Sequence, residues 1–219
     1  MIIEDVFDYK IVRILCDDTT LYKNTELDKS VNFVLQMPST TNRTRGSKGD
    51  SHVGPGVTSV GQPYVGIVYL PGSANLTQWL KTQLLSVQEI FGYQNKTDVL
   101  FKRSWANRLL RGAQGLCHNH VKLDDYMKSL TDYTEENFKP DLVAILYVDV
   151  PENSSNLVFI RDGKSDTYLE EYMEQDRFIL KPKMGELVIH KPENYHAVSV
   201  HNSDLPRTVF VFDIDYSEQ

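Results

Sequence analysis

The chain has 219 residues, 41% of them hydrophobic, which is enough to form the core of one sizeable domain. Its 23 lysines and arginines against 30 acidic residues give a net charge of −7, which weighs against a surface devoted to nucleic acid. The two cysteines, Cys16 and Cys117, form no CxxC pair, so the composition indicates neither a disulfide framework nor a thiolate zinc site and favours a reducing, cytoplasmic setting.

The N-terminus and the hydropathy pattern predict neither secretion nor membrane insertion. Met1–Asp5 lacks the basic and apolar segments of a signal peptide, and no run of about eighteen apolar residues occurs. We therefore expect a single domain over residues 1–219 that does not enter a membrane. The sequence leaves open whether two copies form a homodimer.

The first part of the chain, residues 1–98, combines short apolar segments with polar ones. Lys10–Cys16 and Val31–Met37 are apolar enough to predict strands, as is Tyr64–Leu70. Residues 38–63 are crowded with Ser, Thr, Asn, Gly and Pro, which predicts a long polar loop. A loop of this length in a compact domain is often a lid or a substrate-binding segment, and we keep both roles as hypotheses.

Residues 74–91 carry the clearest helical pattern in the chain. Their apolar residues recur at steps of three and four, which predicts an amphipathic helix that packs on a sheet and supports it. Gly92 is a plausible end for this helix. The apolar stripe consists of Leu76, Trp79, Leu80, Leu84, Val87 and Phe91.

The sequence after Asp98 is divided into short apolar segments that mostly alternate with polar residues. Such alternation is typical of half-buried strands, so residues 99–219 are predicted to form a strand-rich sandwich or barrel. A polar, charged insertion at Lys122–Lys139 is expected at the mouth of this core. The predicted strands are Val99–Asn107, Ala113–His120, Asp141–Val150, Asn156–Arg161, Arg177–Pro182, Gly185–His190, His196–His201 and Arg207–Ile214.

His118, Asn119 and His120, followed much later by His196, are the most informative residues of the chain. Side chains alternate across a strand, so His118 and His120 would share one face while Cys117 points to the other. A third histidine from a distant strand would complete a metal site. Because imidazole binds iron, zinc, copper and nickel, the spacing predicts a metal site without naming the metal.

Other chemistry-bearing residues favour plainer interpretations. His190 and His201 lie near strand ends outside any motif, and His52 lies in the polar loop, so none of the three is expected in the site. The run His118–His120 spells HNH, but nucleases of that name do not require consecutive residues. One basic cluster flanks a predicted strand and would be the place for a nucleic acid, although strand-flanking cations explain it as well; it consists of Lys102, Arg103, Arg108 and Arg111.

Residues 104–214 resemble the Fe(II)- and 2-oxoglutarate-dependent oxygenases, in particular the group that carries H-x-H where most members have H-x-D. The resemblance covers about half of the chain, and the first hundred residues contribute little. It rests on the opening strand Ser104–Asn107, the metal strand Gly115–His120, the tyrosine strand and turn Ala144–Glu152, the segment Lys181–Ile189, the distal histidine in Tyr195–Val198 and the strand Arg207–Phe212.

This resemblance implies a mainly β (α+β) fold, with a double-stranded β-helix core of the jelly-roll, cupin-like type. His118, His120 and His196 would bind Fe(II) from one side. Arg207, eleven residues after His196, would pair with the distal carboxylate of 2-oxoglutarate, since a guanidinium matches a carboxylate bidentately.

Tyr147 and Asn107 are two further implied contacts of the co-substrate. The implied activity is that of a hydroxylating dioxygenase that consumes O₂ and releases succinate and CO₂. Its substrate would be a small molecule or a protein side chain that the sequence does not identify.

The chain departs from the common pattern at His120, which stands where a carboxylate is usual. Asp124 or Asp125, in the polar insertion, is one candidate for the missing carboxylate. Two other functions stay open: a three-histidine cupin-type metalloenzyme that does not use 2-oxoglutarate, and a non-catalytic jelly-roll binding module. Dependence on Arg207 separates the first of these from the main interpretation.

Overall fold

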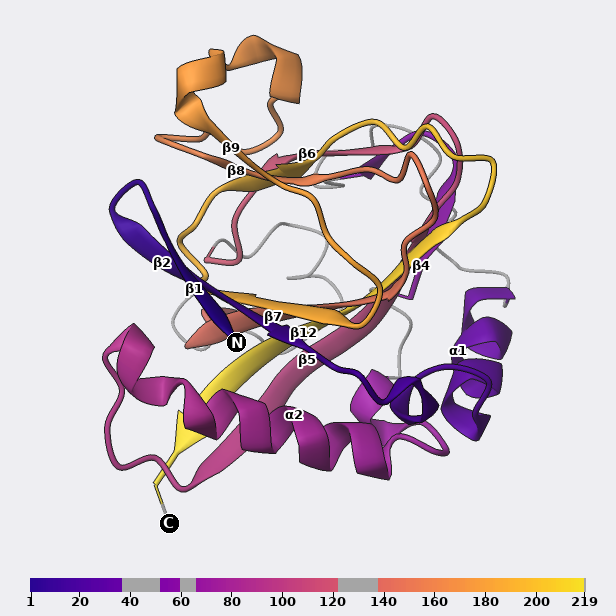
Figure 1. The fold of residues 1–219 in the computed structure, drawn as a ribbon, viewed down its shortest axis with the longest axis vertical. Coiled ribbons are helices and arrows are strands. Elements are labelled where there is room, and N and C mark those ends of the chain that lie inside the picture. Colours follow the sequence, from indigo (N-terminus) through magenta and orange to yellow (C-terminus); the bar gives the residue numbers. More distant parts are fainter. Residues whose placement is uncertain (37–51, 60–65, 122–137, 219) are drawn as a thin grey trace.

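Two antiparallel β-sheets face each other in this computed structural model, which describes residues 1–36, 52–59, 66–121 and 138–218 (Figure 1). Its strands are β1 (Ile2–Val6), β2 (Tyr9–Leu15), β3 (His52–Val53), β4 (Gly56–Thr58), β5 (Asp98–Leu109), β6 (Gln114–His118), β7 (Leu142–Asp149), β8 (Leu157–Ile160), β9 (Arg177–Leu180), β10 (Glu186–His190), β11 (His196–Val198) and β12 (Arg207–Ser217). Its α-helices are α1 (Glu26–Gln36) and α2 (Ala74–Ser86). Short 3₁₀ helices are η1 (Thr19–Leu21), η2 (Ile67–Tyr69), η3 (Gln88–Phe91), η4 (Leu169–Glu171) and η5 (Glu174–Asp176).

The strand order is that of a jelly roll. The seven-stranded sheet has the order β1-β2-β10-β7-β12-β5-β4, and the five-stranded sheet has the order β3-β6-β11-β8-β9. From β5 onward, the chain therefore passes repeatedly between the two facing sheets, which defines a double-stranded β-helix. The predicted fold class is confirmed as a sandwich, and each of the eight strands expected after residue 98 is present with ends shifted by a few residues.

The centre of the large sheet is buried on both faces, which explains why β7 is apolar from Leu142 to Val148. Alternate residues of β7 pack outward into the cluster that contains α2, and the intervening ones pack inward, toward the small sheet. Leu76, Leu80 and Leu84 are the fully buried residues of α2. Figure 1 shows α2 lying along the outer face of the sheet, so the supporting helix is confirmed, with η3 completing the predicted range up to Gly92.

Two predicted strands were wrong. Val31–Met37 belongs largely to α1, whose buried residues, Leu27, Val31, Val34 and Leu35, recur with the helical period that a short window did not reveal. In Tyr64–Leu70, the described residues form η2, in which Ile67 is buried and Tyr69 is 76% exposed. This turn positions Ile67 and Leu70 in the core beside the large sheet. These two apolar residues are therefore buried by a helical turn and not by a strand.

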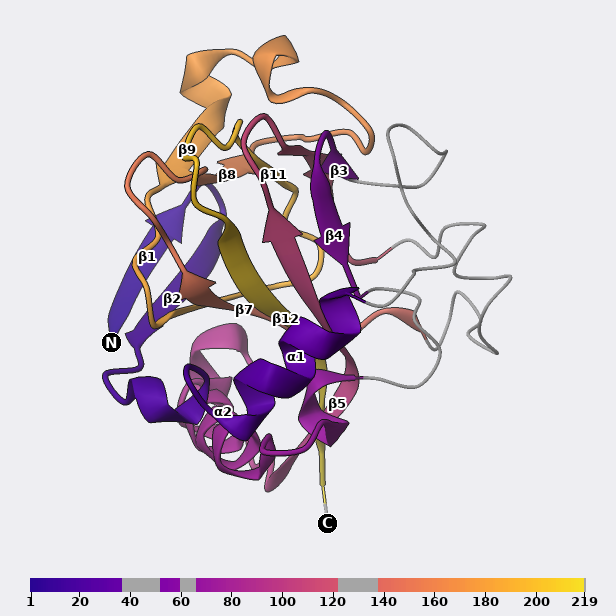
Figure 2. The same cartoon turned by 90° about the vertical axis from the view of Figure 1, so that its right-hand side faces the viewer.

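The segment predicted as a polar loop contributes to both sheets. Within residues 52–59, β3 pairs with β6 and β4 pairs with β5. Figure 2 shows β3 and β4 from the side. Gly54 lies between these strands with φ 95°, and a Cβ there would approach the carbonyl oxygen of Gly112 to 2.8 Å, so the turn requires glycine. The remaining positions of the loop, and residues 122–137 of the predicted insertion, lie outside the described residues.

Both cysteines are buried and free, as the composition suggested. No helix among the described residues is long and apolar enough to cross a membrane.

Candidate metal centre

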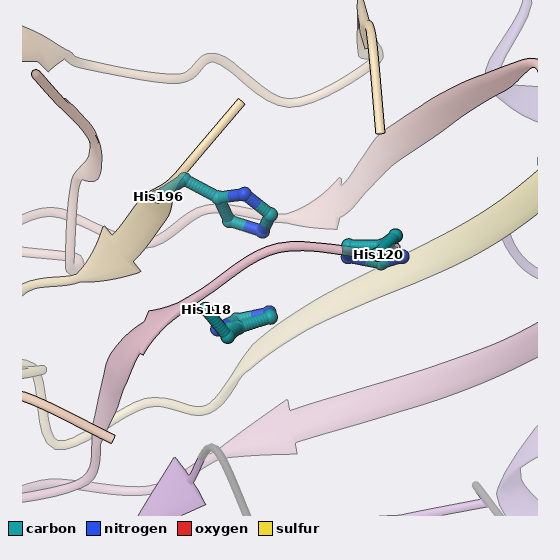
Figure 3. Close-up of side chains that lie close together, drawn as sticks. All are labelled: His118, His120 and His196. Atoms are coloured by element: carbon teal, nitrogen blue, oxygen red, sulfur yellow. The ribbon is translucent and has the colours of Figure 1, made fainter. Parts of the chain in front are cut away.

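Three histidines converge at one end of the space between the sheets. His118 ends β6 and His196 begins β11, and the two are direct partners in the register of these strands. His120 follows β6 in a turn, where its N–H donates to the carbonyl oxygen of Pro192 at 2.9 Å. One ring nitrogen from each histidine lies within 4.8 Å of the others, and Figure 3 shows the three rings turned toward one another. The structure thus brings together the three histidines that the sequence singled out.

The hydrogen bonds of these rings determine which nitrogen is available to a metal. Nδ1 of His118 lies 2.8 Å from the carbonyl oxygen of Leu116, and Nδ1 of His196 lies 3.1 Å from that of Asn194. Nδ1 of His120 lies 2.8 Å from Oδ1 of Asp213.

Because these oxygens only accept, each Nδ1 carries the hydrogen when the ring is neutral, and each Nε2 keeps its lone pair. Three convergent lone pairs are the donor set that a divalent transition metal requires. The residues present therefore fit a metal ion.

Burial keeps the ring of His196 neutral. His196 is 3% exposed and His120 is 7% exposed. Desolvation lowers the pKa of His196 well below its usual value, and the neighbouring histidines lower it further. A neutral imidazole is the form that binds a metal, so His196 does not need to lose a proton first at neutral pH.

A buried carboxylate supports His120 from the large sheet. Asp213 is completely buried, accepts the hydrogen bond from His120 and forms an ion pair with Arg103. Burial raises the pKa of Asp213, but the charge of Arg103 and the hydrogen bond from His120 together outweigh it and hold the pKa below its ordinary value. The nearest carboxylate among the described residues therefore contacts a histidine of the donor group instead of belonging to that group. The suggested alternatives, Asp124 and Asp125, lie outside the described residues.

The inner face of the large sheet forms the floor beneath the histidines. Its register defines rows about 7 Å apart, since each row is two residues further along the strands. His190, Val143, Asp213 and Arg103 form the row nearest the metal centre; Val188, Ile145, Val211 and Trp105 form the next; and Tyr147, Val209 and Asn107 form the third. Arg207 lies two residues beyond Val209 on the same strand. The ring of Trp105 stacks on His120 with centroids 5.9 Å apart, so the centre lies over the first two rows.

Arg207 and Tyr147 form a buried polar pair at the far end of this floor. Arg207 is 2% exposed, and its guanidinium carbon lies 4.9 Å from the centre of the Tyr147 ring. Desolvation lowers the pKa of Arg207 and raises that of Tyr147. Among the described residues, Nε of Arg207 and the hydroxyl of Tyr147 have no hydrogen-bond partner, and no acidic side chain pairs with Arg207. A buried cation beside an unpaired hydroxyl fits an anionic ligand.

Asn107 is already engaged by protein groups. With the amide oriented to satisfy both neighbours, its nitrogen donates to the hydroxyl of Thr58 at 2.6 Å and its oxygen accepts from Nε1 of Trp105 at 3.3 Å. Asn107 thereby links β4 to the tryptophan that stacks on His120. Its contact with a co-substrate stays a prediction.

The other histidines divide into two cases. His201 accepts from the N–H of Ser155 at 3.3 Å and lies 2.8 Å from the carbonyl oxygen of Leu205, so both of its nitrogens serve the backbone. His190 is not one of the three histidines of the donor group, but its ring lies beside that group, with its centroid 4.9 Å from that of His196 and 6.3 Å from that of His120. The alternation of Glu186, Val188 and His190 along β10 was the one sequence signal for this inward position.

The predicted basic cluster does not form a free cationic surface. Each of its members has a partner among the described residues, which agrees with the interpretation of cations that flank a strand. Arg103 pairs with Asp213, Lys102 with Asp215 at 2.8 Å, Arg108 with Asn32 at 2.6 Å and Arg111 with Asp204 at 2.7 Å.

No protein-family model matches the chain, and no curated protein matches it in sequence. Solved structures do match. A prolyl-4-hydroxylase from Pseudomonas putida is 10% identical, with TM-score 0.54 over 96% of this chain and 95% of that one. The non-heme alpha-ketoglutarate-dependent epimerase SnoN of nogalamycin biosynthesis is 12% identical, with TM-score 0.58 over 93% and 76%. HygX from Streptomyces hygroscopicus, with nickel, 2-oxoglutarate and hygromycin B bound, is 12% identical, with TM-score 0.53 over 94% and 82%.

At such low identity these likenesses show the fold alone. The chain has the fold that these 2-oxoglutarate-dependent enzymes share. Its metal centre and its activity are argued from its own residues.

Replacing Asp213 by Asn should weaken divalent metal binding about 10- to 100-fold, because the carboxylate orients His120 and increases its basicity. Calorimetric titration with Ni²⁺ measures this. The matched control is Asp215→Asn on the same strand, where the carboxylate pairs with Lys102 near the surface, and its metal affinity should stay at the wild-type value. Equal affinity of Asp213→Asn and the wild type would contradict this role.

The metal-free protein should lose stability as the pH falls below about 6.5, the usual pKa of histidine. Burial lowers the pKa of His190 to about 3 and that of His196 well below its usual value. At pH values between the usual histidine pKa and these lowered pKa values, the unfolded chain binds more protons than the folded one. As the pH falls through this range, the free energy of unfolding decreases by up to about 1.4 kcal/mol per pH unit for each of the two histidines. Urea unfolding between pH 7 and pH 5.5 tests this, and a flat profile would contradict it.

Proposed function

We propose that the protein is an Fe(II)- and 2-oxoglutarate-dependent dioxygenase that hydroxylates its substrate. The observation that carries the proposal is the pairing of two features on one inner surface. A convergent three-histidine donor set lies at one end, and a buried arginine without an acidic partner among the described residues lies further along. The fold of 2-oxoglutarate-dependent enzymes supports it.

His118, His120 and His196 would hold the iron. Their neutral rings present Nε2, and the Nδ1 hydrogen bonds hold each ring in place. HygX, which shares the fold, has been solved with nickel and 2-oxoglutarate bound. When bound, Fe(II) and 2-oxoglutarate supply the oxidising chemistry, in which O₂ is consumed, succinate and CO₂ are released and a hydroxyl group enters the substrate.

Arg207 and Tyr147 would hold the far carboxylate of 2-oxoglutarate. The guanidinium would donate to it, and the Tyr147 hydroxyl would supply a further hydrogen bond, which satisfies two polar groups that are otherwise buried without partners. Trp105 stacks on His120 and lies one row of the sheet, about 7 Å, from Tyr147. A short dicarboxylate would therefore span the distance between the metal centre and Tyr147. Asn107 would contact the same ligand from the third row.

The inner surface between the two ends is apolar. Val188, Ile145 and Val211 form the middle row, and all three are buried. They would pack against the methylene groups of the co-substrate and exclude water from the reacting metal. The protein would thus bind the two anionic groups of the co-substrate at the two ends of the floor and exclude water from the apolar surface between them.

The substrate would be a small molecule or a protein side chain, with 2-oxoglutarate and O₂ as the other reactants and no role for nucleic acid. The chain would act as one domain. A cytoplasmic location agrees with two buried cysteines that stay free.

A second candidate is a three-histidine metalloenzyme of the cupin type that does not use 2-oxoglutarate. It is favoured by one observation, which is that His120 stands where a carboxylate ligand is usual. Under this alternative, Arg207 would have no part in ligand binding at the metal.

Anaerobic titration with Fe²⁺ and 2-oxoglutarate, followed by visible absorption, tests the proposal. The wild type should form a coloured complex, and His118→Ala should not. Arg207→Met keeps an aliphatic side chain beside Tyr147 but removes the charge, so 2-oxoglutarate should bind at least about 30-fold more weakly while Fe²⁺ binding changes little.

Arg111→Met is the matched control, because Arg111 is an exposed arginine that pairs with Asp204. It should bind both ligands as the wild type does. A wild type that binds Fe²⁺ but not 2-oxoglutarate would favour the second candidate, and one that binds neither would refute both.

A further inference from the structure

His190 is the fourth histidine of the metal centre, although it is not part of the three-histidine donor group. It ends β10, is completely buried and lies in the floor row that contains Asp213. Its ring meets the rings of His196 and Phe159 edge-on, with centroids 4.9 Å and 5.2 Å away. The side chain therefore belongs to the wall of the centre rather than to a separate part of the core.

The hydrogen bonding of His190 repeats that of the three ligands. Its Nδ1 lies 2.8 Å from the carbonyl oxygen of Lys191, which only accepts, so Nδ1 carries the hydrogen. Nε2 then holds a lone pair. Among the described residues, this Nε2 is buried without any hydrogen-bond partner.

An unpaired buried acceptor costs free energy unless a ligand supplies the hydrogen. An apolar side chain would fill this position without that cost, as Val143 does beside His190 in the same row. A donor that binds in the centre would satisfy His190, because its ring lies against that of His196. A metal-bound water is such a donor, because it lies among the same histidines and presents two O–H groups.

We propose that Nε2 of His190 accepts a hydrogen bond from a water molecule bound to the metal. This inference rests on the proposed function, in that it needs the three histidines to hold a divalent metal. His190 acts here as a positioning residue, which holds the water at its coordination position. It therefore makes the water harder to displace by a ligand that has no hydrogen to donate.

The test uses Co²⁺ alone, followed by visible absorption, and then azide, which binds metals but has no hydrogen to donate. His190→Leu removes the acceptor. Cobalt should bind about tenfold more weakly, in the range usual for the loss of an outer partner. Azide should bind the cobalt form of this variant roughly fivefold more tightly than the wild type, because displacing the water no longer breaks a hydrogen bond.

His190→Gln should restore both affinities to within about threefold, since its amide oxygen replaces the acceptor at a similar reach. Metal-free His190→Leu should be at least as stable as the wild type, because it removes an unpaired polar atom. Phe159→Leu is the matched control for packing beside His190 and His196, and it should lower stability while leaving the azide affinity unchanged.

Three results would overturn the inference. In the first, the cobalt and azide affinities of His190→Leu are those of the wild type, so the acceptor has no role. In the second, His190→Gln behaves like His190→Leu, so the ring serves packing only. In the third, the wild type binds no cobalt, which refutes the metal centre itself and with it the proposed function. The first two results, by contrast, refute only the role of His190. If His190→Leu does not fold, His190→Met takes its place.

Discussion

The hydrogen bond from His120 to Asp213 joins the two sheets at the point where the chemistry is expected. His120 belongs to the chain that leaves the small sheet, whereas Asp213 belongs to β12 of the large one. The bond keeps His120 beside His118 and His196 even though β6 has already ended, and it fixes the tautomer that a metal needs. Asp213 can serve in this way because Arg103 compensates its charge in a fully buried position.

The large sheet separates structural from chemical roles through simple alternation. Along β12, Phe210 and Phe212 pack outward into the cluster with α2, whereas Arg207 and Asp213 lie on the inner face with Val209 and Val211 between them. The outer face is stabilised by apolar burial, which leaves the inner face free to carry costly polar groups. One strand, β12, therefore holds both Arg207, the predicted carboxylate-binding residue, and Asp213, which accepts the hydrogen bond from His120. The extended backbone of the strand determines the spacing between them.

The strands and the three histidines were predictable because their signals are local. Alternation, turn residues and the spacing of His118 and His120 are each visible within a few positions. The role of Asp213 was not predictable, since its partner His120 is 93 positions away and one acid in an apolar strand has no local signature. The position of His190 beside His196 was not predictable either, because alternation along β10 indicates the face of the sheet but not the neighbouring side chains. The strands β3 and β4 have only one apolar residue each, Val53 and Val57, because they add to the edges of the sheets, where backbone pairing suffices. Helix α1 was predicted as a strand because only its last turns were considered.

The charges around the centre favour a doubly negative ligand over a neutral one. As neutral imidazoles, the three histidines would leave the full charge on a divalent metal, unlike a set that includes a carboxylate. Asp213 does not cancel this charge, since its own is matched by Arg103. Arg207 adds a buried positive charge at the other end of the same floor. A dicarboxylate would place one anionic group at each positive end of the apolar surface, so a donor set of three histidines strengthens the electrostatic case for the proposed 2-oxoglutarate.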